Sequence, residues 1–100
     1  MLVVAGTIHL DPAKKEEATA AAIEMMRATR AEAGNIEYAF TWDLVEEGMV
    51  RVIEQWEDQA ALDAHFDAPH MAAFMARMGG LGVTGMDVKK YEIASVGPVR

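Results

Sequence analysis

The sequence predicts an α+β fold of the ferredoxin-like type, in which the elements follow the order strand, helix, strand, strand, helix, strand (βαββαβ). Segments rich in Val, Ile and aromatic residues alternate with alanine-rich segments of helical periodicity, and glycine or proline lies at most of the boundaries between them. The length of 100 residues suits one domain. We therefore expect residues 1–100 to form a single domain with its core at about residues 2–96, whose helices cover one face of a four-stranded antiparallel sheet.

The first strand and the first helix are separated by Asp11-Pro12. Leu2 to Leu10 is rich in β-branched residues and predicts a strand. Aspartate is a good helix N-cap and proline suits the first turn, so a helix is expected from Pro12 to Ala33, where alanine is abundant. Gly34-Asn35 predicts a left-handed cap at its end.

The next two strands are expected to form an antiparallel hairpin. Residues 36–42 alternate between large apolar or aromatic side chains and smaller or polar ones, and a second run, Met49 to Glu57, follows a connection that ends in Gly48. With Asp43 opposite Met49, the predicted pairs are Ile36 with Trp56, Tyr38 with Glu54, Phe40 with Val52, and Trp42 with Val50. Opposed side chains share a face, so aromatic rings and the Glu54 carboxylate gather on one side of the sheet.

The second helical region is expected in two parts, because a proline interrupts a helix but begins one well. Asp58 suits the N-cap of a helix over Gln59 to Phe66, and Pro69 begins the second part, which presents Met71, Phe74, Met75 and Met78. The glycine-rich residues 79–82 lack the strand-before, helix-after setting of a phosphate-binding loop and predict a connector. Met86 to Val96 predicts the last strand.

The other face of the hairpin carries a mixed surface that would make a poor core. It consists of Glu37, Ala39, Thr41, Asp43, Met49, Arg51, Ile53 and Gln55. Since the helices lie on the opposite face, this open sheet face is expected to bind a partner.

Composition excludes several classes of function. The formal charge of -7 argues against nucleic acid as a partner, because binding phosphates requires clustered Lys and Arg. No apolar run approaches the roughly 20 residues of a membrane span, and the absence of cysteine excludes thiolate metal sites and thiol nucleophiles. The first basic residue is Lys14, unlike the charged start of a secretory signal, so a cytoplasmic protein is expected.

Two polar residues stand out among the apolar positions. Glu54 is a carboxylate on the aromatic face, where it must be paired, hydrated or raised in pKa; a structural hydrogen bond to Tyr38 is one interpretation and a catalytic role the other. His65 shares a side of its helix with Ala61, Leu62 and Phe66, so it points at the sheet, either as a satisfied core residue or as a base.

A metal site is not predicted. His70 is five positions from His65, off the spacing of three or four that brings two ligands to one side of a helix. Ser95 is the only serine and has no motif around it, which gives no support to a serine nucleophile.

Four motifs follow one another along the chain: Gly34-Asn35-Ile36-Glu37-Tyr38, Glu54-Gln55-Trp56, Ala61-Leu62-Asp63-Ala64-His65 and Ala68-Pro69-His70. In this order, and over about Leu2 to Ala94, the chain resembles the antibiotic biosynthesis monooxygenase (ABM) domain family. The resemblance implies a ferredoxin-like homodimer in which two sheets pack face to face as an α+β barrel. It also implies a cavity between sheet and helices, with Trp56 and His65 in the family's functional positions.

Several activities occur in this family. Members oxidise quinols or polycyclic phenols without metal or flavin, degrade haem, or isomerise a phosphorylated signal molecule. The haem-degrading relatives carry an asparagine on the first strand, where this chain has Ala5-Gly6-Thr7, so haem is disfavoured. The isomerase is similar around the Gly-Asn turn and the Pro-His bend and stays as an alternative.

The resulting hypothesis is a monooxygenase without a cofactor that oxidises a small aromatic substrate with O2. Tyr38, Phe40, Phe74 and His70 form the expected substrate-binding set, with stacking also against Trp56. His65 deprotonates a phenol hydroxyl, the Trp56 indole N–H donates to the developing oxyanion, and Glu54 orients the substrate or the imidazole. The alternatives are an isomerase with a cation such as Lys89 or Lys90 in the pocket, and a non-enzymatic dimeric binding module with a filled pocket.

Overall fold

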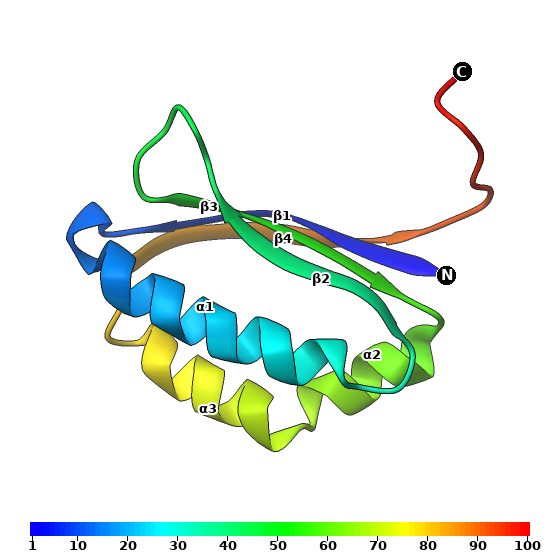
Figure 1. The fold of residues 1–100 in the computed structure, drawn as a ribbon, viewed down its shortest axis with the longest axis horizontal. Coiled ribbons are helices and arrows are strands. Elements are labelled where there is room, and N and C mark those ends of the chain that lie inside the picture. The colour runs from blue at the N-terminus through cyan, green and yellow to red at the C-terminus, as the bar shows by residue number, and fades with distance from the viewer.

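The computed structural model describes residues 1–100 and contains four strands and three α-helices (Figure 1). In chain order they are β1 (Leu2–Leu10), a short 3-10 turn (Pro12–Lys14), α1 (Lys15–Arg30), β2 (Asn35–Trp42), β3 (Met49–Trp56), α2 (Gln59–Phe66), α3 (Pro69–Met78) and β4 (Val83–Glu92). The predicted order of elements is therefore confirmed.

The four strands form one antiparallel sheet in the order β2-β3-β1-β4. All three helices lie on one side of this sheet and leave the other side uncovered (Figure 1). This is the ferredoxin-like α+β arrangement that the sequence predicts. No helix is both long enough and apolar enough to span a bilayer.

The first helical region begins at Pro12 as predicted, although as a 3-10 turn that precedes α1, and it ends three residues early. Asp11 accepts a hydrogen bond from the Ala13 amide at 2.9 Å, and Pro12 opens the turn that leads into α1. At the other end the Ala31 amide donates to the Ala28 carbonyl and the Glu32 amide donates to the Thr29 carbonyl, and the chain leaves the helix there. Residues 31–34 instead form a turn that closes at Gly34 with φ of 82°. Glu32 consequently lies in a turn and not on the predicted helix.

The hairpin register is confirmed over most of its length. Tyr38 lies opposite Glu54, Phe40 opposite Val52 and Trp42 opposite Val50. The pairing of Ile36 with Trp56 is wrong: a bulge between Asn35 and Glu37 brings Asn35 opposite Trp56, and Ile36 is half exposed. A bulge leaves one extra residue of a strand unpaired, and the residues on the far side of the bulge are then paired with different partners.

The predicted break between two short helices is also confirmed. Asp58 caps α2 by accepting from the Ala61 amide at 2.9 Å, and Pro69 is the first residue of α3. The last strand, expected over 86–96, instead spans Val83–Glu92. It begins earlier because a bulge lets Val83 pair with Leu10. It ends earlier because β1 begins at Leu2, and the last backbone bond on this edge joins Ile93 to Met1.

Candidate active site

A cavity of about 520 Å³ lies between the helix-covered face of the sheet and helices α2 and α3. Its walls come from all four strands and are mostly apolar. The residues that matter most for chemistry are Tyr38, Phe40, Glu54, His65, Phe74 and Lys90, and all of them line it. Its size falls within the range of small-molecule sites.

His65 occupies the last turn of α2 and is almost fully buried, with a ring centroid 4.9 Å from Trp56 and 5.4 Å from Tyr38. Its Nδ1 lies 2.6 Å from Oε2 of Glu32. An ionised carboxylate only accepts hydrogen bonds, so Nδ1 carries the proton and a neutral ring has its lone pair on Nε2. No protein group forms a hydrogen bond with Nε2. If Nε2 were fully buried it would be an unpartnered buried atom, but the only such side-chain atom is Thr29 Oγ1. Nε2 therefore keeps access to the cavity that His65 lines.

Glu32 is the functional residue that sequence reasoning missed. It accepts from His65 and also from Nε2 of His70, at 3.0 Å on the same carboxylate oxygen. Its partners lie 33 and 38 positions along the chain, so no local pattern connects them. The useful signal is indirect: an acidic residue two positions before Gly34, in the turn that contacts the Pro-His bend.

The spacing argument that separated His65 from His70 holds only within one helix, whereas the two residues lie on either side of the predicted break at Pro69. Helix α2 ends at Phe66 and α3 begins at Pro69, so the change of direction brings the two rings to 6.0 Å between centroids. His70 does not line the large cavity, and its Nε2 contacts the same Glu32 oxygen as His65 Nδ1. The structure therefore groups His70 with Glu32 and not with the predicted substrate-binding set.

Glu54 and Trp56 are paired with each other. The Trp56 indole N–H donates to Oε1 of Glu54 at 2.9 Å, so the expected partner of Glu54, Tyr38, is wrong. Trp56 is fully buried, does not line the cavity, and its N–H is not free to meet a substrate oxyanion. Its ring instead supports the His65 imidazole.

Burial raises the pKa of Glu54 above its ordinary value, although the Trp56 hydrogen bond and the nearby His65 lower it. The Tyr38 hydroxyl also has a raised pKa, first because of burial and then because of the Glu54 and Glu32 carboxylates. Tyr38 is therefore neutral at physiological pH and presents an intact phenol to the cavity wall.

Replacement Glu54→Gln is expected to change how stability depends on pH. A carboxyl whose pKa is higher when folded than when unfolded stabilises the fold below the unfolded pKa of 4.5, and this contribution disappears as pH rises through the folded pKa. The glutamine still accepts from Trp56, so the variant should gain stability over the parent as pH rises from about 4 to about 7. Urea unfolding at both values measures this difference, and exposed Glu37→Gln is the matched control. A difference that is independent of pH would contradict the assignment.

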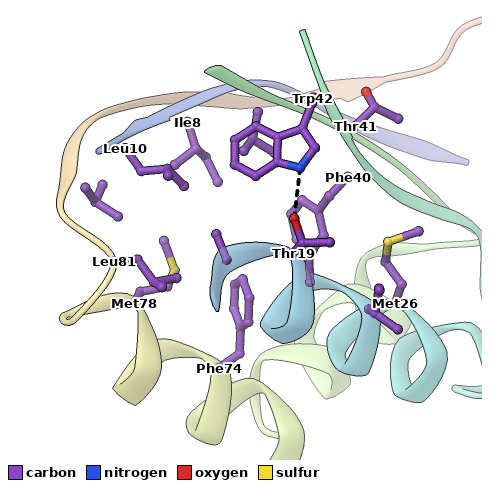
Figure 2. Close-up of a pocket in the computed structure, with 15 residues that line it drawn as sticks. Ile8, Leu10, Thr19, Met26, Phe40, Thr41, Trp42, Phe74, Met78 and Leu81 are labelled. Carbon is purple, nitrogen blue, oxygen red and sulfur yellow. Dashed lines mark hydrogen bonds between the residues drawn. The ribbon is translucent and has the colours of Figure 1, made fainter. Parts of the chain in front are cut away.

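A second, smaller cavity of about 120 Å³ adjoins the first and is lined almost entirely by apolar side chains (Figure 2). The two cavities share Ile8, Phe40, Phe74 and Met78 as wall residues. The indole of Trp42 closes the strand side and donates to Thr19 Oγ1 on α1 at 3.0 Å, the dashed contact in Figure 2. This hydrogen bond fixes the end of β2 to the first helix.

The Trp42–Thr19 pair is expected to show an energetic coupling. A partly buried hydrogen bond of this kind contributes about 0.5–1.5 kcal/mol. In a double-mutant cycle with Trp42→Phe and Thr19→Val, the two single changes should therefore cost more in sum than the double change, by about 1 kcal/mol. Urea unfolding of the four proteins gives the coupling energy, and strictly additive losses would show that the bond contributes nothing.

Both lysines of β4, Lys89 and Lys90, line the cavity, but they have different partners. Lys90 reaches the cavity mouth, where its Nζ donates to Oε1 of Gln59 at 2.7 Å, and both residues line the cavity. Lys89 pairs with Asp87, two positions away, at 2.7 Å. Lys90 is thus the cation at the cavity mouth that is not held by a carboxylate.

Comparison with known proteins finds one matching family model and two related sequences of 31% identity or more. The family model described as antibiotic biosynthesis monooxygenase matches residues 1–77. An uncharacterized protein of Synechocystis is 37% identical over 93 residues, which are 93% of this chain and 63% of that protein. YcnE of Bacillus subtilis, provisionally named a monooxygenase, is 31% identical over 94 residues, covering 94% of this chain and 99% of its own length.

The fold also matches solved structures. A Deinococcus radiodurans protein, provisionally named an antibiotic biosynthesis monooxygenase, superimposes with a TM-score of 0.92 and 22% sequence identity. The alignment covers 100% of this chain and 99% of that one. At this level of identity the likeness shows that the two chains share a fold.

Proposed function

The chain belongs to the antibiotic biosynthesis monooxygenase family, and from this premise we propose that it oxidises a quinol or polycyclic phenol with O2, using no metal or flavin. The observation that carries the proposal is the Glu32–His65 dyad, whose free Nε2 belongs to a ring in the wall of an aromatic-lined cavity. General bases act from such positions when a carboxylate holds the imidazole in one tautomer.

The proposed reaction begins with proton transfer. His65 Nε2 takes the proton of a phenol hydroxyl, and the phenolate passes one electron to O2, which leaves a phenoxyl radical and superoxide. These combine at a ring carbon that bears hydrogen to form a peroxide anion, which takes the proton back from the His65 imidazolium and becomes a hydroperoxide. Loss of water from the hydroperoxide converts that carbon to a carbonyl, so one oxygen atom enters the product and the other leaves as water. Here the electron-rich substrate supplies the electrons that a flavin would otherwise provide.

The walls of the cavity suit a flat aromatic substrate. Phe40 and Phe74 lie with their rings stacked at 5.7 Å and 22°, and Tyr38 meets Phe40 edge-on at 5.2 Å. Offset and edge contacts of this kind favour a further ring beside them. The adjoining apolar cavity would offer space for a second or third fused ring of the substrate. Glu54 and Trp56 would act indirectly, by supporting the His65 ring.

An oxygen electrode tests the proposal. A small panel of quinols and anthrone-like phenols, offered without added metal or flavin and in the presence of a chelator, should show uptake that depends on the protein. With ¹⁸O₂, one labelled atom should appear in the product. Absence of protein-dependent uptake across the panel would overturn the monooxygenase assignment.

A second candidate function is isomerisation of a small, phosphorylated carbonyl compound, which the position of Lys90 favours. Its Nζ stands at the cavity mouth with a neutral partner, so it is available to an anionic group. This reaction would consume no oxygen, which separates it from the first candidate. A purely binding module, expected to have a filled pocket and His65 bonded to Glu54 or backbone, fits less well with the open cavity and the Glu32 contact.

We also propose that the open sheet face joins two copies of the chain as a homodimer in the cytoplasm. This face is not covered by the helices and mixes apolar with charged groups, among them the Arg51–Asp43 pair at 3.0 Å. Light scattering on the purified protein should give twice the chain mass of 10.9 kDa. A monomer at all concentrations would rule out this part of the proposal.

A further inference from the structure

We propose that Glu32, His65 and His70 together bind one divalent transition-metal ion, and that this ion and the base function of His65 exclude each other. The three residues lie on three separate segments: the turn after α1, the end of α2 and the start of α3. They form a site distinct from the large cavity, which only His65 touches.

The donor atoms already converge. His65 Nδ1 and His70 Nε2 lie 2.6 Å and 3.0 Å from the same oxygen of Glu32, and the three groups offer ligand atoms that all lie within 4.8 Å of one another. Zinc takes imidazole nitrogen and carboxylate oxygen at about 2.0–2.2 Å, which puts neighbouring donors roughly 3–3.5 Å apart. The two contacts with Glu32 must therefore lengthen by less than about 1 Å to admit an ion, and the two imidazole nitrogens, which lie within 4.8 Å of each other, must come to about the same separation.

Charge favours a cation at this point. The side chain of Glu32 is only 15% exposed, yet no lysine or arginine pairs with it. The nearest arginine in sequence, Arg30, donates instead to the Tyr38 carbonyl at 2.9 Å. Glu54, which is also buried and has no basic partner, adds a second carboxylate nearby. Buried carboxylates are normally paired with a cation or bound to a metal, and the only basic groups that contact Glu32 are the two imidazoles that would share the ion with it.

The donor set selects the class of metal. Two imidazoles and one carboxylate suit Zn²⁺, Co²⁺ and Ni²⁺, whereas Mg²⁺ and Ca²⁺ prefer oxygen ligands. Three protein ligands leave a position for water, and the partly exposed His70 gives the ion a route from solvent. We therefore expect a single site that binds zinc and ignores magnesium.

Metal binding would reverse the tautomer of His65. In the hydrogen-bonded state Nδ1 carries the proton and Nε2 has the lone pair that faces the cavity. A metal on Nδ1 takes that lone-pair position, and the neutral ring must then carry its proton on Nε2. The same nitrogen that would accept a phenol proton becomes a donor, so the loaded protein has no base in the cavity.

Calorimetric titration with zinc, after removal of metals by a chelator, tests the site directly. The parent protein should bind one equivalent of Zn²⁺, and Co²⁺ should give visible d–d bands of a nitrogen- and oxygen-ligated ion. His70→Ala should weaken zinc binding about tenfold or more, because second and third ligands add strongly to affinity. Glu32→Gln should do the same, and circular dichroism checks that both variants are folded.

His9 provides the matched control. It is the one remaining histidine of the chain and also has a carboxylate neighbour, Glu46 at 4.0 Å. Its side chain is 40% exposed, and the pairing of β1 places it far from the cluster. His9→Ala should leave zinc binding unchanged. The proposal is overturned if the parent binds no Zn²⁺, or if His9→Ala weakens binding as much as His70→Ala does.

Oxygen uptake tests the mutual exclusion separately. Stoichiometric Zn²⁺ should abolish uptake with a hydroquinone, and chelator should restore it. Uptake that continues unchanged in the zinc-loaded protein would overturn the exclusion. If the monooxygenase proposal itself fails, no uptake is seen with or without metal, whereas calorimetry still decides whether the site exists.

Discussion

His65→Gln is expected to lower protein-dependent oxygen uptake by about a hundredfold or more, within the range of a lost general base. The glutamine amide can still donate to Glu32, so the buried carboxylate keeps one of its partners. It has no group that accepts a proton at neutral pH. The loss should therefore appear in kcat, with a smaller change in KM, because the aromatic walls that bind the substrate stay in place.

The matched control for this experiment is the same substitution at His9, on the open sheet face. His9→Gln should retain the uptake of the parent, provided that light scattering shows an unchanged oligomeric state. A substrate supplied already ionised, at a pH above the pKa of its phenol, should recover part of the rate in His65→Gln. Equal uptake by the parent and His65→Gln at neutral pH would remove His65 from the mechanism.

The fold could be predicted from the sequence because its signals are local. The β-branched run of β1, the aspartate caps and the period-two pattern of β2 each act within a few residues. The period of two along each strand then placed Tyr38, Phe40 and Glu54 on one face of the sheet. A register slip of two residues would change their partners but not this face. The errors lie at the ends of elements, where a bulge or the end of a neighbouring strand decides the boundary.

The site could be predicted only in part, because its key contact is not local. The position of His65 follows from helical periodicity, but its partner comes from a turn 33 residues earlier. The sequence offered Glu54 as the carboxylate for this histidine, since both face the same cavity. Tertiary packing instead gives Glu54 to Trp56 and Glu32 to His65. Two carboxylates near one imidazole thus have separate tasks, and only the folded chain distinguishes them.

Glu32→Gln is expected to lower kcat for oxygen uptake by about a hundredfold, although Glu32 does not touch the cavity. The carboxylate can only accept from Nδ1 and therefore holds the lone pair on Nε2. An amide can also donate, which allows the tautomer with the proton on Nε2 and leaves no base toward the substrate. KM should change little, because Glu32 is a positioning residue and contributes nothing to the aromatic walls.

Nitrogen NMR of the histidine side chains separates this effect from a general loss of structure. In the parent the His65 ring should show its proton on Nδ1, and in Glu32→Gln a substantial fraction should carry it on Nε2. Glu32→Asp, which keeps an acceptor-only group on a shorter stem, should recover part of kcat, while exposed Glu37→Gln should behave as the parent. Assays in chelator exclude the metal effect. A purely structural role of Glu32 would not set the tautomer of His65. A loss of kcat without any change of tautomer would therefore mean that Glu32 supports only the packing of the turn.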